Sequence, residues 1–460
     1  MLDPELLSEV LAAALSTGGR FAEVFVEDRV STSIRLDDGR VEELTSGLDR
    51  GAGIRVLLGE SQAYAHTNRW DRDALVEAAR AAAAAATAEG GTTMVPFRHA
   101  ETVPVHDVRI PFADVPAERK VDWVREADDA ARAHSSDVRQ VIAGYGESEQ
   151  RVLIANSEGL WAEDVRPRIR VTVHVVAARD GVIQTGFHSP GGLTGAEFLE
   201  EHTGRAVAEE AARQAVTMLD GRPAPAGEMA VVMGPGGGGV MFHEACGHGL
   251  EADLIQKEAS LYRGKLGQRL ASPLFTGVED ATLRSAWGSY AFDDEGTPSS
   301  RVVLFEKGVL TDYLYDRVRA ERDGVASNGH GRRQSYAHLP IPRMANSHIL
   351  GGDDDPEAIV AGTARGLYAR KLGGGQVNPA TGDFVFGVAE GYLIEHGELA
   401  YPVRGANLIG NGPAVLSAID ALAADFDVFH GVCGKDGQGV PVSNGSPTLR
   451  IGRMTVGGTG

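Results

Sequence analysis

Two histidines and a glutamate near the middle of the chain form the pattern H-E-x-x-x-H, which runs from His243 through Glu244 to His248. Two imidazoles can hold a zinc ion, and a carboxylate between them can take a proton from a water on that ion. The pattern has one residue more than the familiar H-E-x-x-H of metalloproteases. It therefore predicts a metal-dependent hydrolase with an altered helix at its site.

The extra residue constrains the backbone that carries the two imidazoles. On an ideal helix, side chains five positions apart lie about 140° from each other, whereas those four positions apart lie about 40° from each other. His243 and His248 can therefore reach one ion only where the helix is widened, for example by a π-bulge. Gly247 is the residue at which the backbone would accept this distortion most easily.

A glycine-rich turn precedes the motif. The apolar run at residues 229–233 is followed by Gly-Pro-Gly-Gly-Gly-Gly at residues 234–239, which predicts a strand, a tight turn and then the helix with the motif. A phosphate-binding loop is the weaker interpretation, because the Lys-Ser/Thr that ends a P-loop is missing. The glycines are therefore interpreted as a close connection.

A catalytic zinc usually has three protein ligands, so a third one is needed. Cys246 lies on the motif helix but points away from the shared side of the imidazoles, and it is interpreted as a small core residue. Cys433 lies in a glycine-rich stretch that is expected to form an irregular loop, where its thiolate would suit zinc and Lys435 would lower the thiol pKa. From the residues alone, a buried free cysteine is an equal alternative for Cys433.

Four further histidines are weaker candidates. His430 lies three residues before Cys433 and is a candidate supporting group or spare ligand. His330, His338 and His348 lie in a polar stretch with several arginines, where such side chains are usually solvated or structural. A direct catalytic role is therefore not the preferred interpretation for any of these three.

The composition indicates a folded, glycine-rich protein of several domains. The chain has 460 residues, of which 43% are hydrophobic and 23% charged, and its 59 glycines favour many tight turns. The formal net charge of −20 disfavours nucleic acid and anionic membranes as direct partners. The two cysteines form no disulfide framework, the first residues predict a folded helix rather than a leader, and no apolar run is long enough to span a membrane. These features predict a cytoplasmic protein.

Three segments are expected to position the site, in an α+β fold. An N-terminal α+β domain (1–95) has a helix capped by Asp3, and strands at 21–26, 33–36, 41–44, 53–58 and 62–66. A middle α+β domain (105–222) has helices at 118–134 and 196–219, and strands at 140–145, 150–156, 160–164, 168–178 and 182–188. The C-terminal domain (228–460) carries the metal helix. Its short apolar runs between turn residues predict antiparallel sheets in a barrel or a sandwich.

The chain closely resembles the TldD/PmbA family of metallopeptidases. HEACGHGLE at 243–251 fits the metal motif of that family, and further matches follow in order at 294–298, 328–336, 342–346, 373–379, 381–383, 390–394, 402–406, 408–413, 433–435 and 455–458. The resemblance is dense over 228–460 and looser, but collinear, before it. The PmbA-type partner lacks the metal motif, so this chain is similar to the TldD type.

The resemblance implies a zinc-dependent endopeptidase or carboxy-trimming peptidase that acts on unstructured or modified peptides. It implies zinc ligands at His243, His248 and Cys433, with Glu244 as the catalytic base. It also implies a heterodimer with a PmbA-like subunit, with a homodimer as the alternative, and an enclosed site that admits extended chains. Such a substrate could lie along a sheet edge or against the bare backbone of residues 373–375.

One stretch departs from the family pattern. The family sequence VPVGVGQPT appears here as VPVSNGSPT at residues 440–448, with the changes between Ser443 and Ser446. Because this stretch is expected to be a loop directly after the third ligand, substrate preference is expected to differ.

A second hypothesis belongs to a different class. The chain would be a non-catalytic peptide-binding or assembly subunit with a structural metal, and such sites usually have four protein ligands. His430 as a fourth ligand would favour this hypothesis. Glu244 argues against it, because a structural site does not need a carboxylate there.

Overall fold

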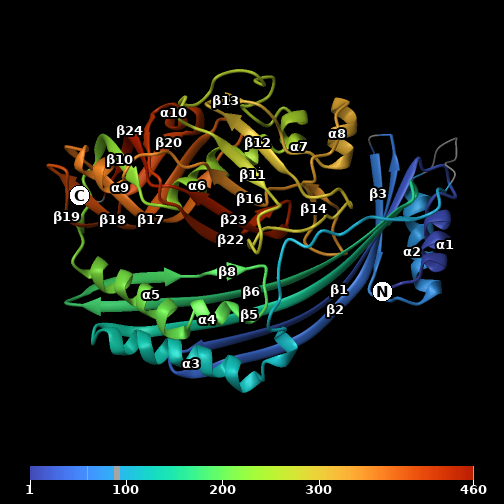
Figure 1. Cartoon of the computed structure of the whole chain (residues 1–460), viewed down its shortest axis with the longest axis horizontal. Coiled ribbons are helices and arrows are strands. Elements are labelled where there is room, and N and C mark those ends of the chain that lie inside the picture. The colour runs from blue at the N-terminus through green and yellow to red at the C-terminus, as the bar shows by residue number, and fades with distance from the viewer. Residues whose placement is uncertain (60, 87–93, 459–460) are drawn as a thin grey trace.

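A long curved sheet forms one side of the molecule (Figure 1). In the computed structural model, which describes residues 1–59, 61–86 and 94–458, its strands follow the order β3-β2-β1-β5-β6-β4, and β7 and β8 also pair with β6. Antiparallel pairing of β1 with β5 joins the strands of the first two segments in this one sheet. The strands are β1 (Phe21–Asp37), β2 (Arg40–Leu58), β3 (Ser61–Thr67), β4 (Arg98–His99), β5 (Val138–Asn156), β6 (Leu160–Arg179), β7 (Val182–His188) and β8 (Gly191–Gly192).

The central strands are longer than the sequence predicts. Breaks were expected at 27–32, 146–149 and 165–167, but β1, β5 and β6 run through these stretches without interruption. Polar residues in these stretches resemble turn residues, yet Glu27, Glu147 and Arg166 are buried. Each of them is paired with polar groups, so a strand can continue through it. The expectation of several short strands is therefore wrong.

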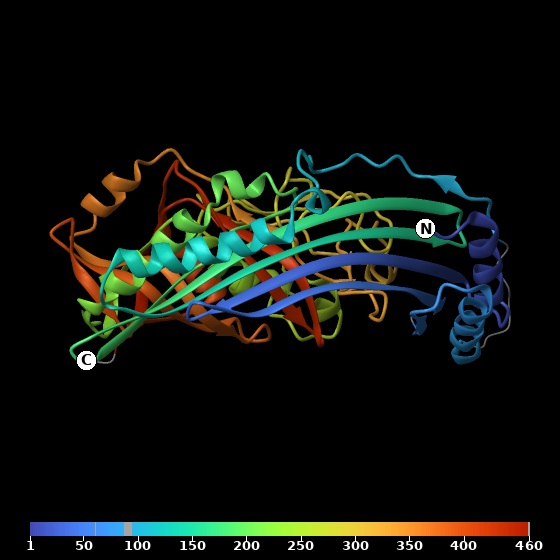
Figure 2. The same cartoon turned by 90° about the horizontal axis from the view of Figure 1, so that it is seen from below.

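Two pairs of helices cover one face of the sheet at its two ends (Figures 1 and 2). Asp3 accepts a hydrogen bond from the Leu6 amide at 2.9 Å and Pro4 begins the first helix, as expected. No helix in the described part of the chain is long and apolar enough to cross a membrane. The pairs are α1 (Pro4–Ala14) with α2 (Arg72–Ala85), and α3 (Ala117–His134) with α5 (Gly204–Leu219); α4 (Phe198–Glu201) precedes α5.

The C-terminal segment lies along the opposite face of the sheet and is rich in strands, as predicted (Figure 1). Strands β17, β10, β24, β20 and β18 form a barrel, which the pairing of β17 with β18 closes. Strands β19, β9 and β21 extend the same sheet outside the barrel. The strands of this sheet are β9 (Arg222–Pro223), β10 (Gly227–Met233), β17 (Arg365–Val377), β18 (Asp383–Glu395), β19 (Glu398–Arg404), β20 (Asn407–Asn411), β21 (Ile419–Leu422) and β24 (Leu449–Gly457).

A second sheet of this segment follows the order β13-β12-β11-β16-β23-β22 and presents the hairpin of β22 and β23 to the long sheet. The strands are β11 (Gly277–Asp280), β12 (Arg301–Glu306), β13 (Val309–Leu310), β16 (Asn346–Ile349), β22 (Asp427–Lys435) and β23 (Gln438–Ser446), with β14 (Gly331–Arg332) and β15 (Ile341–Pro342) as a separate pair. The short helices of the C-terminal segment are α6 (Gly237–Phe242), α7 (Ala252–Gln256), α8 (Arg317–Asp323), α9 (Pro356–Ala361) and α10 (Gly412–Ser417).

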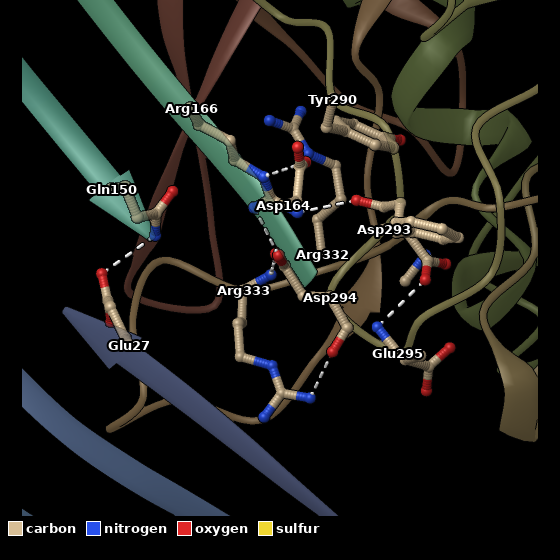
Figure 3. Close-up of polar contacts among 12 residues, drawn as sticks. Glu27, Gln150, Asp164, Arg166, Tyr290, Asp293, Asp294, Glu295, Arg332 and Arg333 are labelled. Atoms are coloured by element: carbon tan, nitrogen blue, oxygen red, sulfur yellow. Dashed lines mark hydrogen bonds and ion pairs between the residues drawn. The ribbon is translucent and has the colours of Figure 1, made fainter. Parts of the chain in front are cut away.

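Buried charges join the long sheet to the C-terminal segment (Figure 3). Arg166 on β6 pairs with Asp164 at 2.9 Å and with Asp294 at 2.7 Å. Glu23 on β1 pairs with Arg333 at 2.5 Å, and all these side chains are nearly or fully buried. The loops around 294 and 333 are therefore fixed to the sheet, and they lie next to the elements that carry the candidate site.

We expect Arg166→Met to lower the free energy of unfolding by about 3–5 kcal/mol, because it removes the ion pairs of two buried carboxylates with Arg166. Chemical denaturation monitored by fluorescence would measure the loss. Arg151→Met on the adjacent strand is the control, since its ion pair with Glu149 is exposed and should contribute about 1 kcal/mol or less. Equal effects of the two variants would contradict a stabilising role for the network.

Candidate metal centre

The H-E-x-x-x-H motif begins where a short α-helix widens. Helix α6 ends at Phe242, a π-helix spans His243–Gly247, and a 3₁₀ turn spans His248–Leu250. In a π-helix, residues five positions apart come one above the other, so the two imidazoles share one side. Their ring centroids lie 5.2 Å apart. The structure thus confirms the π-bulge that the spacing predicts.

The glycines before the motif let α6 approach its neighbours closely. A Cβ on Gly238 would lie 2.4 Å from the Leu449 side chain, and one on Gly239 would lie 2.5 Å from the backbone nitrogen of Gly445. The expected order of strand, tight turn and helix is present, from β10 to α6. The glycines therefore serve close packing of the metal helix against β23 and β24, in agreement with the preferred interpretation.

His243, His248 and Cys433 converge on one point. Their candidate ligand atoms all lie within 4.8 Å of one another. Cys433 Sγ is 3.3 Å from Nε2 of His243 and 3.4 Å from Nε2 of His248. Two imidazoles and one thiolate at this separation fit a soft-to-borderline divalent metal ion such as zinc.

Cys433 lies on a regular strand rather than in the irregular loop that was expected. It belongs to β22, pairs with Val440 of β23, and precedes a tight turn at Asp436 and Gly437, both with positive φ. The glycines around it therefore do not mark an irregular loop, because a two-residue hairpin turn satisfies the same sequence signal.

A second hydrogen bond orients each imidazole. Nδ1 of His243 lies 3.3 Å from Ser347 Oγ, which in turn donates to Glu279 at 2.6 Å. Nδ1 of His248 lies 3.2 Å from the buried carboxylate of Glu251. Contacts of this kind fix the ring tautomer so that Nε2 faces an ion. No role was predicted from the sequence for Ser347, Glu279 or Glu251. Of the three, only Glu251 could have been found from the sequence, because it ends the motif stretch and lies about one helical turn after His248.

The electrostatics favour the thiolate form of Cys433. Burial alone would raise the pKa of its thiol, but hydrogen bonds and charges from His243 and His248 lower it to about 5. Lys435 does not act as expected, because its ammonium lies 3.0 Å from Glu251 and 2.6 Å from Asp253. Burial would raise the pKa of Glu251, but Lys435 and His248 hold it at about 2. Lys435 therefore supports the carboxylate that orients His248.

Glu244 lies on the more open side of this group. Its Oε2 is 3.8 Å from Nε2 of His248, and its side chain is 32% exposed. In contrast, His243 and Cys433 are buried. A carboxylate placed there can exchange a proton with a water or a substrate atom near the three candidate ligands.

The remaining cysteine and His430 lie outside this group. Cys246 is fully buried among apolar side chains and its Sγ accepts a hydrogen bond from Tyr262 at 3.1 Å, which confirms its interpretation as a core residue. His430 and Cys433 are three positions apart on β22, so their side chains point to opposite faces of the strand. There it lines a cavity of about 550 Å³ together with Phe187 and His188, so the expected role as a spare ligand is wrong.

The other three histidines make contacts away from the candidate ligands. The backbone oxygen of fully buried His330 accepts from the Arg343 amide, and His338 lies 2.9 Å from Ser335 Oγ. The His348 ring lies against the ring of Phe426, with centroids 5.2 Å apart. These contacts agree with the preferred structural interpretation.

The stretch that departs from the family pattern is not a loop. Ser443, Asn444 and Gly445 belong to β23, which pairs in parallel with β16 and antiparallel with β22. All three are buried, and the backbones of Asn444 and Gly445 lie against Gly239 of α6. The departure therefore changes the packing behind the metal helix rather than an exposed loop, and the expected effect on substrate preference stays a prediction.

We expect Gly247→Ala to lower both stability and metal affinity. A Cβ there would lie 2.1 Å from Sδ of Met344, which is itself fully buried, so either the Met344 side chain or the π-helix next to His248 must shift. The expected losses are about 1–3 kcal/mol of unfolding free energy and roughly 10- to 100-fold in metal affinity. Thermal unfolding and competition with a chelator would measure them. Gly47→Ala, with open space around the new Cβ, is the control, and wild-type metal affinity in Gly247→Ala would contradict the prediction.

Comparison with known proteins gives matches along nearly the whole chain. Three domain models of one family match: the PmbA/TldA metallopeptidase domain 1 at residues 22–86, its central domain at 110–219 and its C-terminal domain at 226–458. A metalloprotease TldD homolog from Haemophilus influenzae is 39% identical over 448 residues, which cover 95% of this chain and 93% of the relative.

Two further matches come from archaea. A metalloprotease from Methanothermobacter thermautotrophicus is 35% identical over 441 residues, which cover 95% of this chain and 96% of that protein. The crystal structure of TldE from Thermococcus kodakarensis superimposes with a TM-score of 0.79 at 17% identity, over 98% of this chain and 99% of that one. The structural match shows that the two chains share a fold.

Proposed function

The chain belongs to the PmbA/TldA metallopeptidase family, and we propose on this basis that it is a zinc-dependent peptidase that cleaves unstructured or modified peptides. The observation that carries the proposal is the convergence of His243, His248 and Cys433 within 4.8 Å, with Glu244 on their open side. Two imidazoles and a thiolate favour zinc among the common divalent ions.

In the proposed mechanism, Glu244 handles the proton. When bound, a zinc ion would supply Lewis-acid polarisation of the scissile carbonyl and would make a neighbouring water more acidic. Glu244 would accept a proton from the attacking water and pass it to the leaving amine. Ser347 and Glu251 would keep Nε2 of the two imidazoles directed at the site.

The hypothesis of a non-catalytic subunit with a structural metal has less support. A structural zinc usually has four protein ligands, whereas the group found in the described residues has three. His430, the candidate fourth ligand, lines a cavity on the other face of β22. The partial exposure of Glu244 also suits a working carboxylate better than a structural one.

We also propose that the chain works in a dimer, either with a PmbA-like subunit or with a second copy. The first half of β2 pairs with β1, while its pairing with β3 begins only at Ala52. In this half, Leu44 is 51% exposed and Leu48 is 59% exposed, and Val30 opposite Leu48 on β1 is 53% exposed. An open strand edge can pair with another chain, and exposed apolar side chains that gather on one surface often mark an interaction site.

A cytoplasmic location completes the proposal. The two cysteines, Cys246 and Cys433, are both unpaired, which suits a reducing compartment. In such a compartment, the thiolate proposed as a ligand would stay reduced.

Metal analysis combined with peptide digestion tests this function. We expect about one zinc per chain, cleavage of an unfolded polypeptide but not of a compact folded one, and loss of cleavage after chelation. Each assay is run with and without a PmbA-like subunit, with light scattering to give the mass of the complex. A chain that binds no metal, or that cleaves equally well after chelation, would refute the proposal.

A further inference from the structure

A cavity of about 200 Å³ lies between the long sheet and the hairpin of β22 and β23. Its walls include Arg166 and Arg168 from β6, Arg332 from β14, and Val432 from β22. Val432 directly precedes Cys433, and consecutive residues of a strand point to opposite faces. The candidate metal site and this cavity therefore lie on the two faces of one hairpin.

Two of the arginines in the cavity wall lack a carboxylate partner. Within residues 1–59, 61–86 and 94–458, no carboxylate lies at ion-pair distance from Arg168 or Arg332. Both are nearly sealed in the protein, with exposed fractions of 7% and 4%. A buried cation without a counter-ion lowers stability unless other groups stabilise it. For Arg332, part of this stabilisation comes from the Tyr290 ring, whose centroid lies 5.0 Å from the guanidinium carbon.

The guanidinium groups are held in place by backbone oxygens. Arg168 donates through Nε to the oxygen of Trp287 at 3.1 Å and through Nη2 to that of Ser289 at 3.0 Å. Arg332 donates through Nη1 to the oxygens of Met344 and Pro441. These bonds fix the planes of both groups but use only part of their donors.

Both arginines line the cavity, and each has a terminal nitrogen that is not used within the protein. Nη1 of Arg168 and Nη2 of Arg332 have no protein acceptor in the described residues. Both atoms remain accessible to solvent, whereas the unpaired Nε of Arg333 is completely buried. The arginines beside them differ, because Arg166 uses all three nitrogens on Asp164, Asp294 and a backbone oxygen. Fixed guanidinium groups with free donors are well suited to bind the two oxygens of an anion.

The charge around Arg168 is consistent with this arrangement. Burial, followed by the positive charges of Arg166 and Arg332, lowers the pKa of the Arg168 guanidinium to about 9. Burial is the largest of these causes, and the carboxylates of Asp164 and Asp294 act against them without cancelling them. In contrast, the charges of Glu23 and Asp294 raise the pKa of Arg333 against its burial.

We propose that this cavity is a subsite for a carboxylate of the peptide substrate, bound by Arg168 and Arg332. The carboxylate is either the C-terminal group of the peptide or the side chain of an aspartate or glutamate. The inference rests on the proposed peptidase function and deepens it by naming a substrate feature. In the described part of its sheet, β22 is the outer strand, and an extended peptide passing along it presents successive groups to the metal face and to the cavity face.

Paired peptides test the subsite. The two peptides of the first pair differ only at the C-terminus, which is a carboxylate in one and a carboxamide in the other. In the second set all peptides end in a carboxamide, and each position in turn carries either Asp or Asn. We expect the metal-loaded chain to favour one carboxylate form by roughly 10- to 100-fold in kcat/KM, and Arg168→Gln or Arg332→Gln to reduce that preference to within about threefold. Preference in the first pair assigns the terminal group, and preference in the second assigns a side chain.

Two further variants separate charge recognition from structural damage. Arg168→Lys keeps the positive charge but loses the fixed guanidinium plane, so its preference should lie between that of the wild type and that of Arg168→Gln. Arg170→Gln is the matched control: Arg170 is two residues along the same face of β6, also donates to a backbone oxygen of β22, and does not line the cavity. This variant should keep the full preference. Loss of preference in Arg170→Gln to the same extent would overturn the subsite.

Binding to the Glu244→Ala chain, measured by calorimetry with the same uncleaved peptides, separates this inference from the proposed function. If the metal-loaded wild-type chain cleaves no peptide, but the acid form binds to the Glu244→Ala chain more tightly than the amide does, the peptidase proposal fails and the subsite stands. If peptides are cleaved without any carboxylate preference, or if the preference persists in both Gln variants, the subsite fails and the peptidase proposal stands.

Discussion

Glu244→Ala should lower kcat for peptide cleavage by roughly 100- to 10,000-fold, the usual contribution of a general base, while the metal content stays near that of the wild type. The carboxylate lies 3.8 Å from Nε2 of His248 but outside the group of three candidate ligands, so its removal leaves these ligands in place. The measurement combines kcat on a fluorogenic unstructured peptide with zinc per chain by mass spectrometry on the same sample.

Two variants sharpen this test. Glu244→Gln keeps the shape of the side chain but cannot accept the proton, so it should be about as inactive as the alanine variant. Glu357→Ala, an exposed glutamate in the first turn of α9, should behave like the wild type. Undiminished hydrolysis by a zinc-loaded Glu244→Ala chain would rule out the proposed base.

Cys433→Ala should release the metal and, with it, nearly all activity. Removing a ligand should weaken binding by more than the roughly 10- to 100-fold typical for the loss of a supporting hydrogen bond. The two imidazoles that remain are too few for a stable catalytic zinc site. Zinc per chain after dialysis and the affinity in competition with a chromogenic chelator would measure the effect.

Cys246→Ala is the matched control for this variant, because Cys246 is the only other cysteine in the sequence and is also buried. Its Sγ belongs to the apolar core and not to the candidate ligand group, so zinc content should be unchanged and only a modest loss of stability should follow. A Cys433→Ala chain that keeps one zinc after dialysis would exclude the thiolate as a ligand.

The local part of the site could be predicted from the sequence. The π-helix follows from the spacing of His243 and His248, because the angle between side chains depends only on the residues between them. The first helix was found from Asp3 and Pro4, which act within one turn. Predictions of this kind succeed where the cause and the effect lie close together in the chain.

The rest of the site depends on contacts between distant parts of the chain. Cys433 lies 190 residues after His243, and its residues alone left a ligand and a free thiol equally open. Ser347 and Glu279 reach His243 through the pairing of β16 with β11, a register that no local pattern encodes. The long strands were also missed for this reason, because the partners that allow Arg166 to be buried come from the C-terminal segment.

The uninterrupted strands of the long sheet have a mechanical consequence. A hinge between the first two segments would have to bend β1, β2, β5 and β6 together, against ladders that extend nearly the full length of each strand. These segments should therefore move together as one rigid unit. Any movement of these segments away from the C-terminal segment would have to break the buried ion pairs of Arg166 with Asp294 and of Glu23 with Arg333, so these pairs should limit how far the two parts separate.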